Sequence, residues 1–344
     1  MKTLNLGLIG VGRIGTMHAN NLNALRPTLA DRGLEVNLWI TDVAADYART
    51  VAAGLGATFF DSVNAMIEAG VDALLIATGT MTHPDLIRAG IAANLPVFCE
   101  KPVAGDVESA LPLLEEIAAN NGRVQIGHQR RFDVGYLEAK RRVDAGDLGW
   151  IHTMRAVTGD MVPPSLEFIA TSGGLFRDCS VHDFDILRWL TGKEIVEVYA
   201  KGSNNGDPGI GAAGDVDTAL AVLTFDDGTV ATASATRYNG AGHDVRLEIQ
   251  GSKSTVVVGL DEQSAMCSAE LGVEFPRGTS HQTFIERFDG AYRAELVAFI
   301  EYVLGERENP CSAWDAVAAS RVADAAQESL LTGAPVAINP VPVA

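Results

Sequence analysis

The stretch that decides the fold is Leu4–Met17, which reads LNLGLIGVGRIGTM. Its first half is apolar and predicts a short strand, and the apolar positions that follow recur at helical spacing. Between them, Gly10 makes a tight turn, Gly12 lets the backbone approach a pyrophosphate and Gly15 lets the helix pack close to the strand. A surface glycine loop is the alternative. The strand before the motif and a second predicted strand at Val36–Ile40 favour a dinucleotide site.

An acidic residue follows the second predicted strand. Asp42 lies where a carboxylate accepts hydrogen bonds from the adenosine ribose of a bound dinucleotide. The same carboxylate repels the 2′-phosphate of NADP and no arginine comes directly after it, so the sequence predicts NAD as the cofactor. A plain turn or capping role is the alternative. The spacing from Gly15 is longer than usual, and Leu25–Leu34 carries the extra length.

Composition limits the class of protein. The 344 residues fit two domains, and the net charge of −18 argues against nucleic acid as a partner, because phosphate binding needs clustered basic side chains. No signal-peptide pattern and no membrane-spanning apolar run is found, so we expect a cytoplasmic protein that does not bind membranes. Four widely spaced cysteines form no C-x-x-C pair, so neither a metal site nor a disulfide framework is predicted.

The first third of the chain alternates short apolar runs with amphipathic segments, as a parallel sheet with crossover helices requires. We therefore expect a Rossmann domain, a doubly wound parallel sheet, over residues 1–125. Ligands bind beyond the carboxyl ends of such strands, so Thr78, Gly79 and Thr80 are expected to face the cofactor. Further strands are predicted at Asp72–Thr80, Leu95–Cys99 and Arg123–Ile126.

The tripeptide Glu100-Lys101-Pro102 directly follows the predicted strand Leu95–Cys99. At the mouth of a parallel strand, beside the predicted nicotinamide, Lys101 is a functional candidate. The alternative is a solvated lysine in a loop. Farther along, Arg130 and Arg131 are adjacent; because such arginines are usually solvated or paired with carboxylates, their ligand role stays open.

Residues 126–344 predict an α+β domain with a large, mainly antiparallel sheet, in which Asp226-Asp227-Gly228 forms a hairpin turn. Its helices are expected at Val134–Asp144, Val181–Leu190, Tyr292–Leu304 and Ser312–Leu331, the last of which returns toward the first domain. Two of its strands carry apolar residues on both faces, so we expect a dimer or tetramer. The expected strands are Ile151–Val157, Ile195–Ala200, Thr218–Phe225, Thr229–Thr236, Val245–Ile249 and Thr255–Val258.

An aspartate and a histidine stand four residues apart in this half, at Asp178 and His182. On a helix they project from one face and can touch. A histidine beside a carboxylate suits proton transfer near neutral pH. The alternative is a hydrogen-bonded core histidine capped by the aspartate.

Four segments together resemble the Gfo/Idh/MocA oxidoreductases, most closely the inositol 2-dehydrogenase branch. They are GVGRIG at residues 10–15, EKP at 100–102, GHQRRFD at 127–133 and DCSVHDFD at 178–185. The resemblance spans nearly the whole chain and implies a Rossmann domain followed by an open-faced sheet domain, commonly assembled into tetramers. It identifies Lys101, Asp178 and His182 with the catalytic triad of that branch.

The resemblance also extends the expected sites. Departures from the family concern the substrate: Gly79 stands where proline is frequent, and Gln129 replaces an apolar residue. The expected substrate contacts are Lys101, Arg130, Asp160, Asp178, His182, Asp185 and Tyr238. The expected cofactor contacts are Gly10, Gly12, Arg13, Ile14, Gly15, Asp42, Thr78, Thr80, His83, Glu100, Lys101 and Gln129.

The leading hypothesis is an NAD-dependent dehydrogenase that oxidises a secondary hydroxyl of a cyclic polyol, myo-inositol first, to the ketone. His182 takes the hydroxyl proton, Asp178 orients the imidazole and Lys101 stabilises the developing alkoxide charge. Two alternatives remain: scyllo-inositol or an aldopyranose as the substrate, and a non-catalytic NAD-binding regulator.

Overall fold

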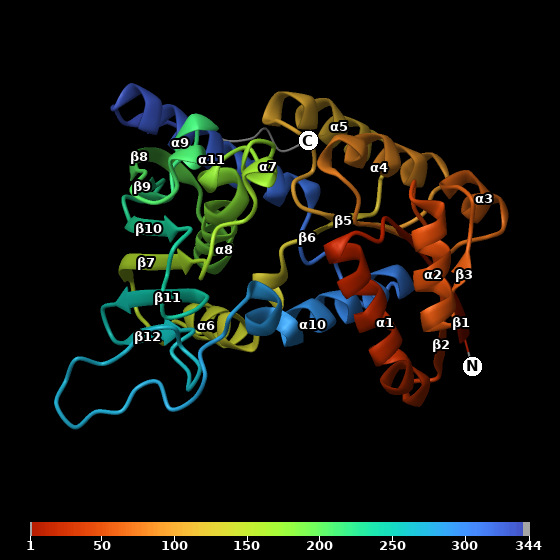
Figure 1. Cartoon of the computed structure of the whole chain (residues 1–344), viewed down its shortest axis with the longest axis horizontal. Coiled ribbons are helices and arrows are strands. Elements are labelled where there is room, and N and C mark those ends of the chain that lie inside the picture. The colour runs from red at the N-terminus through yellow and green to blue at the C-terminus, as the bar shows by residue number, and fades with distance from the viewer. Residues whose placement is uncertain (1, 340–344) are drawn as a thin grey trace. The chain divides into compact units, whose positions relative to one another are not determined.

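The computed structural model describes residues 2–339 and divides into two compact units (Figure 1). The first comprises residues 2–129 and Gly290–Val317, and the second comprises Arg130–Asp289 and residues 318–339. The sequence suggests a domain boundary between residues 125 and 126, a few residues before the boundary in the structure. It also assigns Gly290–Val317 to the second domain, whereas in the structure this segment belongs to the first unit. Residue 1 and residues 340–344, the outer ends of the two predicted domains, lie outside the described residues.

The first unit is a doubly wound parallel sheet, as the sequence predicts. Its strands lie in the order β3-β2-β1-β4-β5-β6, and every neighbouring pair is parallel. The order reverses beside β1, which places the switch point of the sheet at the glycine turn. The strands are β1 (Lys2–Ile9), β2 (Leu34–Thr41), β3 (Thr58–Phe59), β4 (Ala73–Ile76), β5 (Val97–Glu100) and β6 (Val124–Gly127).

Helices connect these strands and cover the sheet (Figure 1). Continuous apolar strands such as β4, in which all four residues are buried, suit a sheet covered on both faces. The core also contains Leu296, Phe299 and Ile300, which explains why Gly290–Val317 belongs to this unit. The helices are α1 (Arg13–Asp31), α2 (Ala45–Leu55), α3 (Val63–Glu68), η1 (Thr80–Thr82), α4 (His83–Ala92) and α5 (Val107–Ala119).

Two elements of this unit differ in length from the prediction. The run Asp72–Thr80 forms a strand only over β4, because the chain then turns into η1, where the Thr82 hydroxyl donates to the Gly79 carbonyl oxygen at 2.9 Å. The extra length before Asp42 is helical: α1 continues through Pro27 to Asp31.

The second unit contains a seven-stranded sheet in the order β12-β11-β7-β10-β9-β8-β13. All neighbours are antiparallel except β7 and β10, which confirms a mainly antiparallel sheet. The predicted hairpin joins β9 to β10 through Gly228, whose φ is +86°. The strands are β7 (Ile151–Gly159), β8 (Ile195–Ser203), β9 (Thr218–Phe225), β10 (Val230–Thr236), β11 (Asp244–Gly251), β12 (Thr255–Val258) and β13 (Val336–Ala337).

The helices of the second half include two that both units share: α10 (Phe284–Leu304), which has non-helical backbone angles at Phe288, and α11 (Ala313–Thr332). No helix in the described part of the chain is long and apolar enough to cross a membrane. The remaining helices are η2 (Gln129–Phe132), α6 (Val134–Asp144), α7 (Leu166–Ile169), η3 (Phe176–Ser180), α8 (Val181–Thr191) and α9 (Pro208–Ala212).

Candidate functional site

The glycine turn after β1 has the geometry that the motif demands. Gly10 has a φ of +92°, and a Cβ atom there would lie 2.7 Å from the Ala77 carbonyl oxygen. A Cβ atom at Gly15 would lie 2.0 Å from the Gly10 carbonyl oxygen, so α1 packs directly on the turn. Gly12, in contrast, faces open space. The turn therefore leaves one exposed backbone position at the start of α1, beside Arg13 and Ile14.

No side chain caps the N-terminus of α1, so its first N–H groups face this turn. The end of β2 is tied to it: Asp42 accepts hydrogen bonds from the Val11 N–H at 2.7 Å and the Ala44 N–H at 2.8 Å. Each carboxylate oxygen retains a further lone pair for a ribose hydroxyl. An uncapped helix N-terminus and an acidic residue at the end of β2 fit the pyrophosphate and ribose of NAD.

The carboxyl end of β4 is joined to the segment after β5 through a histidine. His83 is buried, with Nδ1 2.7 Å from the Pro102 carbonyl oxygen and Nε2 3.1 Å from the Thr78 carbonyl oxygen. Its ring therefore holds the backbone beside Lys101. The Thr78 hydroxyl lies 2.7 Å from that of Thr82, and the Thr80 side chain is half-buried.

Lys101 is half-buried at the end of β5, and its peptide bond to Pro102 is cis. The neighbouring Glu100 carboxylate contacts His18 on α1, with 2.6 Å between Oε1 and Nε2. This contact links β5 to α1. Gln129 is buried in η2.

A cluster of charged side chains lies at one edge of the second sheet, where the parallel strands β7 and β10 end and β11 begins. Gly159, Thr236 and Asp244 are paired in register there, so the residues next to them meet. Asp160 Oδ1 lies 3.2 Å from His243 Nδ1, and Asp160 Oδ2 lies 3.7 Å from Arg237 Nη1. We call Asp160, Asp178, Asp215, Arg237 and His243 the sheet-edge cluster.

Asp178 belongs to the π-helical turn η3, and His182 lies in the first turn of α8 that follows. Such wide turns are frequent at functional sites. The Arg237 guanidinium donates to Asp178 Oδ2 at 2.6 Å and to Cys179 Sγ at 3.3 Å. Burial acts to lower the pKa of Arg237, but Cys179 and the nearby carboxylates raise it by a larger amount. The pKa therefore lies above its ordinary value, and the side chain stays charged.

Arg130 and Asp185, two of the expected substrate contacts, are buried in ion pairs within the second unit. Arg130 Nη1 lies 2.5 Å from Asp183 Oδ1, and its Nη2 donates to the Thr158 hydroxyl at 3.0 Å. Arg131 binds Asp185 through two hydrogen bonds, at 2.9 and 2.6 Å. These pairs join η2 to α8 and so support the helix that carries His182.

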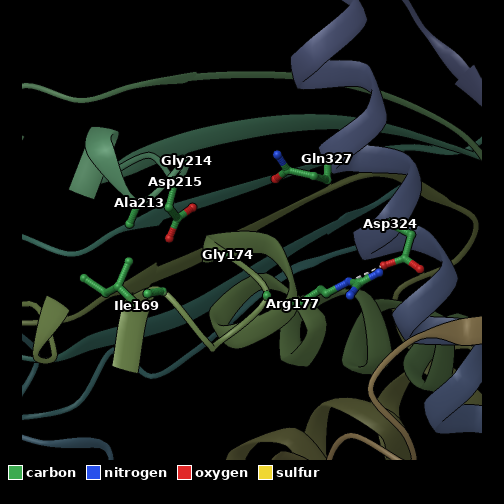
Figure 2. A pocket seen from close by; sticks show the side chains of 10 residues that line it. Ile169, Gly174, Arg177, Ala213, Gly214, Asp215, Asp324 and Gln327 are labelled. Carbon is green, nitrogen blue, oxygen red and sulfur yellow. Dashed lines mark hydrogen bonds and ion pairs between the residues drawn. The ribbon is translucent and has the colours of Figure 1, made fainter. Parts of the chain in front are cut away.

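Tyr238 is partly exposed, and its hydroxyl accepts a hydrogen bond from the Asp207 N–H at 3.3 Å. A pocket of about 350 Å³ opens elsewhere in this unit. Figure 2 shows the Arg177–Asp324 ion pair in its wall, with Asp215 lying apart from the pair, next to Ala213 and Gly214. Asp215 reaches the sheet-edge cluster, with its Oδ2 3.7 Å from Arg237 Nη2. The pocket is lined by Ile169, Ala170, Gly173, Gly174, Arg177, Ala213, Gly214, Asp215, Asp324 and Gln327.

Sequence reasoning did not identify His18, Asp215, Arg237 and His243 as members of these groups. Arg237 carries a sequence signal, because it directly follows the predicted strand Thr229–Thr236, much as Lys101 comes just after Leu95–Cys99. His18 and His243 carry no such signal, since their partners Glu100 and Asp160 are 82 and 83 residues away in the chain.

Similarity to known proteins covers both units. Residues 4–128 match the description "Oxidoreductase family, NAD-binding Rossmann fold", and residues 140–338 match "Oxidoreductase family, C-terminal alpha/beta domain". A myo-inositol dehydrogenase of Streptomyces leeuwenhoekii is 36% identical over 96% of this chain and 98% of its own. The myo-inositol 2-dehydrogenase of Thermotoga maritima is 34% identical over 95% of this chain and 96% of its own.

A solved structure agrees with these matches. The scyllo-inositol dehydrogenase of Lactobacillus casei, with bound NAD(H) and scyllo-inositol, superposes with a TM-score of 0.85 at 30% identity and covers 98% of this chain and 99% of its own. The first unit agrees with the match to an NAD-binding Rossmann fold, because it contains the glycine turn, Asp42 and the expected order of parallel strands. The chain therefore belongs to the Gfo/Idh/MocA family of NAD-binding oxidoreductases.

Proposed function

We propose that this protein oxidises a secondary hydroxyl of a cyclic polyol to a ketone, with myo-inositol as the first substrate to test. The observation that carries the proposal is the ion pair that holds Asp178, four residues before His182: Asp178 Oδ2 accepts a hydrogen bond from the buried Arg237 at 2.6 Å. An aspartate fixed in this way can orient an imidazole and stabilise its protonated form. The myo-inositol dehydrogenases named above support the substrate class.

In the proposed reaction, His182 takes the proton of the substrate hydroxyl as the general base. Asp178 orients the imidazole, and Lys101 donates a hydrogen bond to the reacting oxygen, where negative charge develops. Bound NAD supplies the acceptor for the hydride that leaves the same carbon. Asp160 and Tyr238 are the proposed contacts to other hydroxyls. Arg130 and Asp185 support the site indirectly, because their charges are taken up by ion pairs.

The cofactor contacts are proposed from the first unit. Gly12, Arg13 and Ile14 border the exposed start of α1, and Asp42 binds the ribose. Thr78 and Thr80 lie beyond the end of β4. His83 and Glu100 act through the backbone and through His18, respectively, and Gln129 lies in η2 after the last strand.

The proposal includes a cytoplasmic location and a homotetramer. All four cysteines are free thiols, as is typical of a reducing compartment. The outer face of the second sheet carries exposed apolar residues, which are typical of an interface between subunits.

The test is NADH production, followed by absorbance, with purified protein and a panel of myo-inositol, scyllo-inositol and aldopyranoses. Turnover of myo-inositol above the other compounds supports the proposal. A preference for scyllo-inositol or an aldopyranose would correct the substrate. If the protein binds NAD but reduces it with no compound of the panel, the regulator hypothesis replaces the enzyme.

A further inference from the structure

Arg237 is the most enclosed charged group in the sheet-edge cluster. It follows β10, and its side chain is only 1% exposed. Three carboxylates from three segments face its guanidinium: Asp178 at 2.6 Å, and Asp160 and Asp215 at 3.7 Å each. The only one of the three within hydrogen-bond distance is Asp178.

A buried guanidinium needs an ionised partner, because a single charge removed from water is strongly destabilising. Asp178 is the carboxylate within hydrogen-bond distance of the guanidinium, so the pairing fixes its Oδ2 atom. Nη2 faces Asp215 Oδ2 at a longer distance, and neither atom has a hydrogen-bond partner among residues 2–339. Arg237 is therefore held in place chiefly through Asp178.

The charges around Arg237 do not balance. Asp160, Asp178 and Asp215, when ionised, exceed the single guanidinium by two negative charges. The other titratable groups at the cluster are Cys179, which accepts from Arg237, and His243, which contacts Asp160. Such an excess favours a cation nearby, and His182 follows Asp178 by four residues.

We propose that Arg237 is a positioning residue for the general base: it holds one oxygen of the Asp178 carboxylate so that the other orients the His182 imidazole. This inference rests on the proposed function. It differs from a purely structural role, in which Arg237 would neutralise buried carboxylates without affecting His182.

The test replaces Arg237 with Gln and with Lys. Arg237→Gln is expected to lower kcat on the order of tenfold to a hundredfold, the scale typical of losing a group that orients a functional ligand, with a smaller change in KM. Arg237→Lys should recover part of the rate, because its ammonium keeps the charge but lacks the planar fork. If Arg237→Gln does not fold, Arg237→Lys still tests the positioning: a lower kcat with little change in KM supports the proposal, and a wild-type kcat contradicts it.

The pH dependence separates positioning from simple stability. Loss of a positive charge beside Asp178 favours the imidazolium, so the acid limb of the kcat profile should move to higher pH in Arg237→Gln. Arg188 supplies the matched control: it is also buried, lies on α8 with His182 and binds Glu194 at 2.7 Å. Arg188→Gln should lower thermal stability and leave the pH profile unchanged.

Histidine NMR gives a readout that needs no turnover. The pKa of His182, assigned by comparison with His182→Ala, should rise in Arg237→Gln in the enzyme without substrate. That rise without any dehydrogenase activity would reject the proposed function and support the coupling of Arg237 to His182. An unchanged His182 titration together with kcat within about twofold of wild type would make Arg237 structural and overturn the inference.

Discussion

His182 carries the proton in the proposed reaction, so the groups that set its charge set the working pH of the enzyme. The sheet-edge cluster, which contains Asp178, consists mostly of carboxylates, and its one fixed cation among the described residues is Arg237. The same segment is supported from η2, where Arg131 binds Asp185 on α8. The segment from Asp178 to Asp185 is thus held by two buried arginines from different elements.

Removal of either catalytic candidate should separate chemistry from cofactor binding. His182→Ala and Lys101→Ala are each expected to lower kcat on the order of a hundredfold to ten-thousandfold, because one loses proton transfer and the other loses charge stabilisation. NAD affinity, measured by fluorescence titration, should change little. Wild-type turnover in His182→Ala would make the histidine structural and contradict the mechanism.

Asp42 should decide the choice of dinucleotide. We expect kcat/KM to be at least about a hundredfold higher with NAD than with NADP, since a carboxylate beside a 2′-phosphate costs several kcal/mol. Asp42→Asn is the informative variant, because its side-chain oxygen can still accept the Val11 N–H that ties β2 to the glycine turn. This variant should fold, and its preference for NAD over NADP should be smaller than that of the wild type. Equal efficiency of the wild-type enzyme with both cofactors would refute the assignment.

The sequence singles out Asp178 and His182 as a candidate pair because they stand four residues apart, where local spacing is informative. It could not predict that Asp178 is bound by Arg237, 59 residues later. That contact depends on η3 lying against β10, a long-range arrangement that no local period encodes. For Arg130 the sequence suggests a ligand that the fold does not favour. Its residue type fits a substrate contact, and only the fold reveals that its charge is paired with Asp183.

Among the elements, α1 and the glycine turn before it allow helix packing and cofactor binding to be tested separately. Gly15→Ala places a Cβ atom 2.0 Å from the Gly10 carbonyl oxygen, so it should destabilise the protein by about 1–3 kcal/mol or more. Gly12→Ala meets no atom within 4 Å, and its φ of −62° suits alanine. It should unfold like wild type but bind NAD more weakly. Thermal unfolding and NAD titration of both variants check this, and a stable Gly15→Ala would contradict the packing.

Helix α6 contains a buried titratable group, Tyr136. Burial raises the pKa of its phenol from 10.0 to about 12, so between these values the folded state keeps a proton that the unfolded state releases. The stabilisation is complete below pH 10 and falls as the pH rises to 12, by about 2–3 kcal/mol. Tyr136→Phe should lose this dependence in urea unfolding. If wild type and Tyr136→Phe lost the same stability between pH 10 and pH 12, the loss would come from groups other than Tyr136.

At the scale of the whole chain, both sheets could be predicted because their strands are short apolar runs bounded by turn residues. Three features lay beyond the reach of local pattern. They are the parallel pairing of β7 with β10, the short β13 strand beside β8, and the membership of Gly290–Val317 in the first unit. The last follows from Leu296, Phe299 and Ile300, whose helical spacing shows a buried face but not which sheet covers it.

The outer face of the second sheet leads to the prediction about assembly. Leu220 and Val222 on β9 are 50% and 43% exposed, and Val230 on β10 is similarly exposed. The strand registers place Val222 in one row with Tyr199 on one side, and with Thr232, Arg155, Glu248 and Val257 on the other. Exposed apolar side chains on one broad face favour pairing with the same face of another subunit.

We therefore expect wild-type protein to be a dimer or tetramer by light scattering at micromolar concentration. The double variant Leu220→Arg with Val222→Arg should shift to smaller species, because it buries two charges in a self-complementary interface. Leu331→Arg is the matched control, since Leu331 is also exposed but lies near the end of α11 and not on a strand of the sheet. It should keep the wild-type size. A monomeric wild-type protein, or an equal shift in the control, would show that this face does not form the interface.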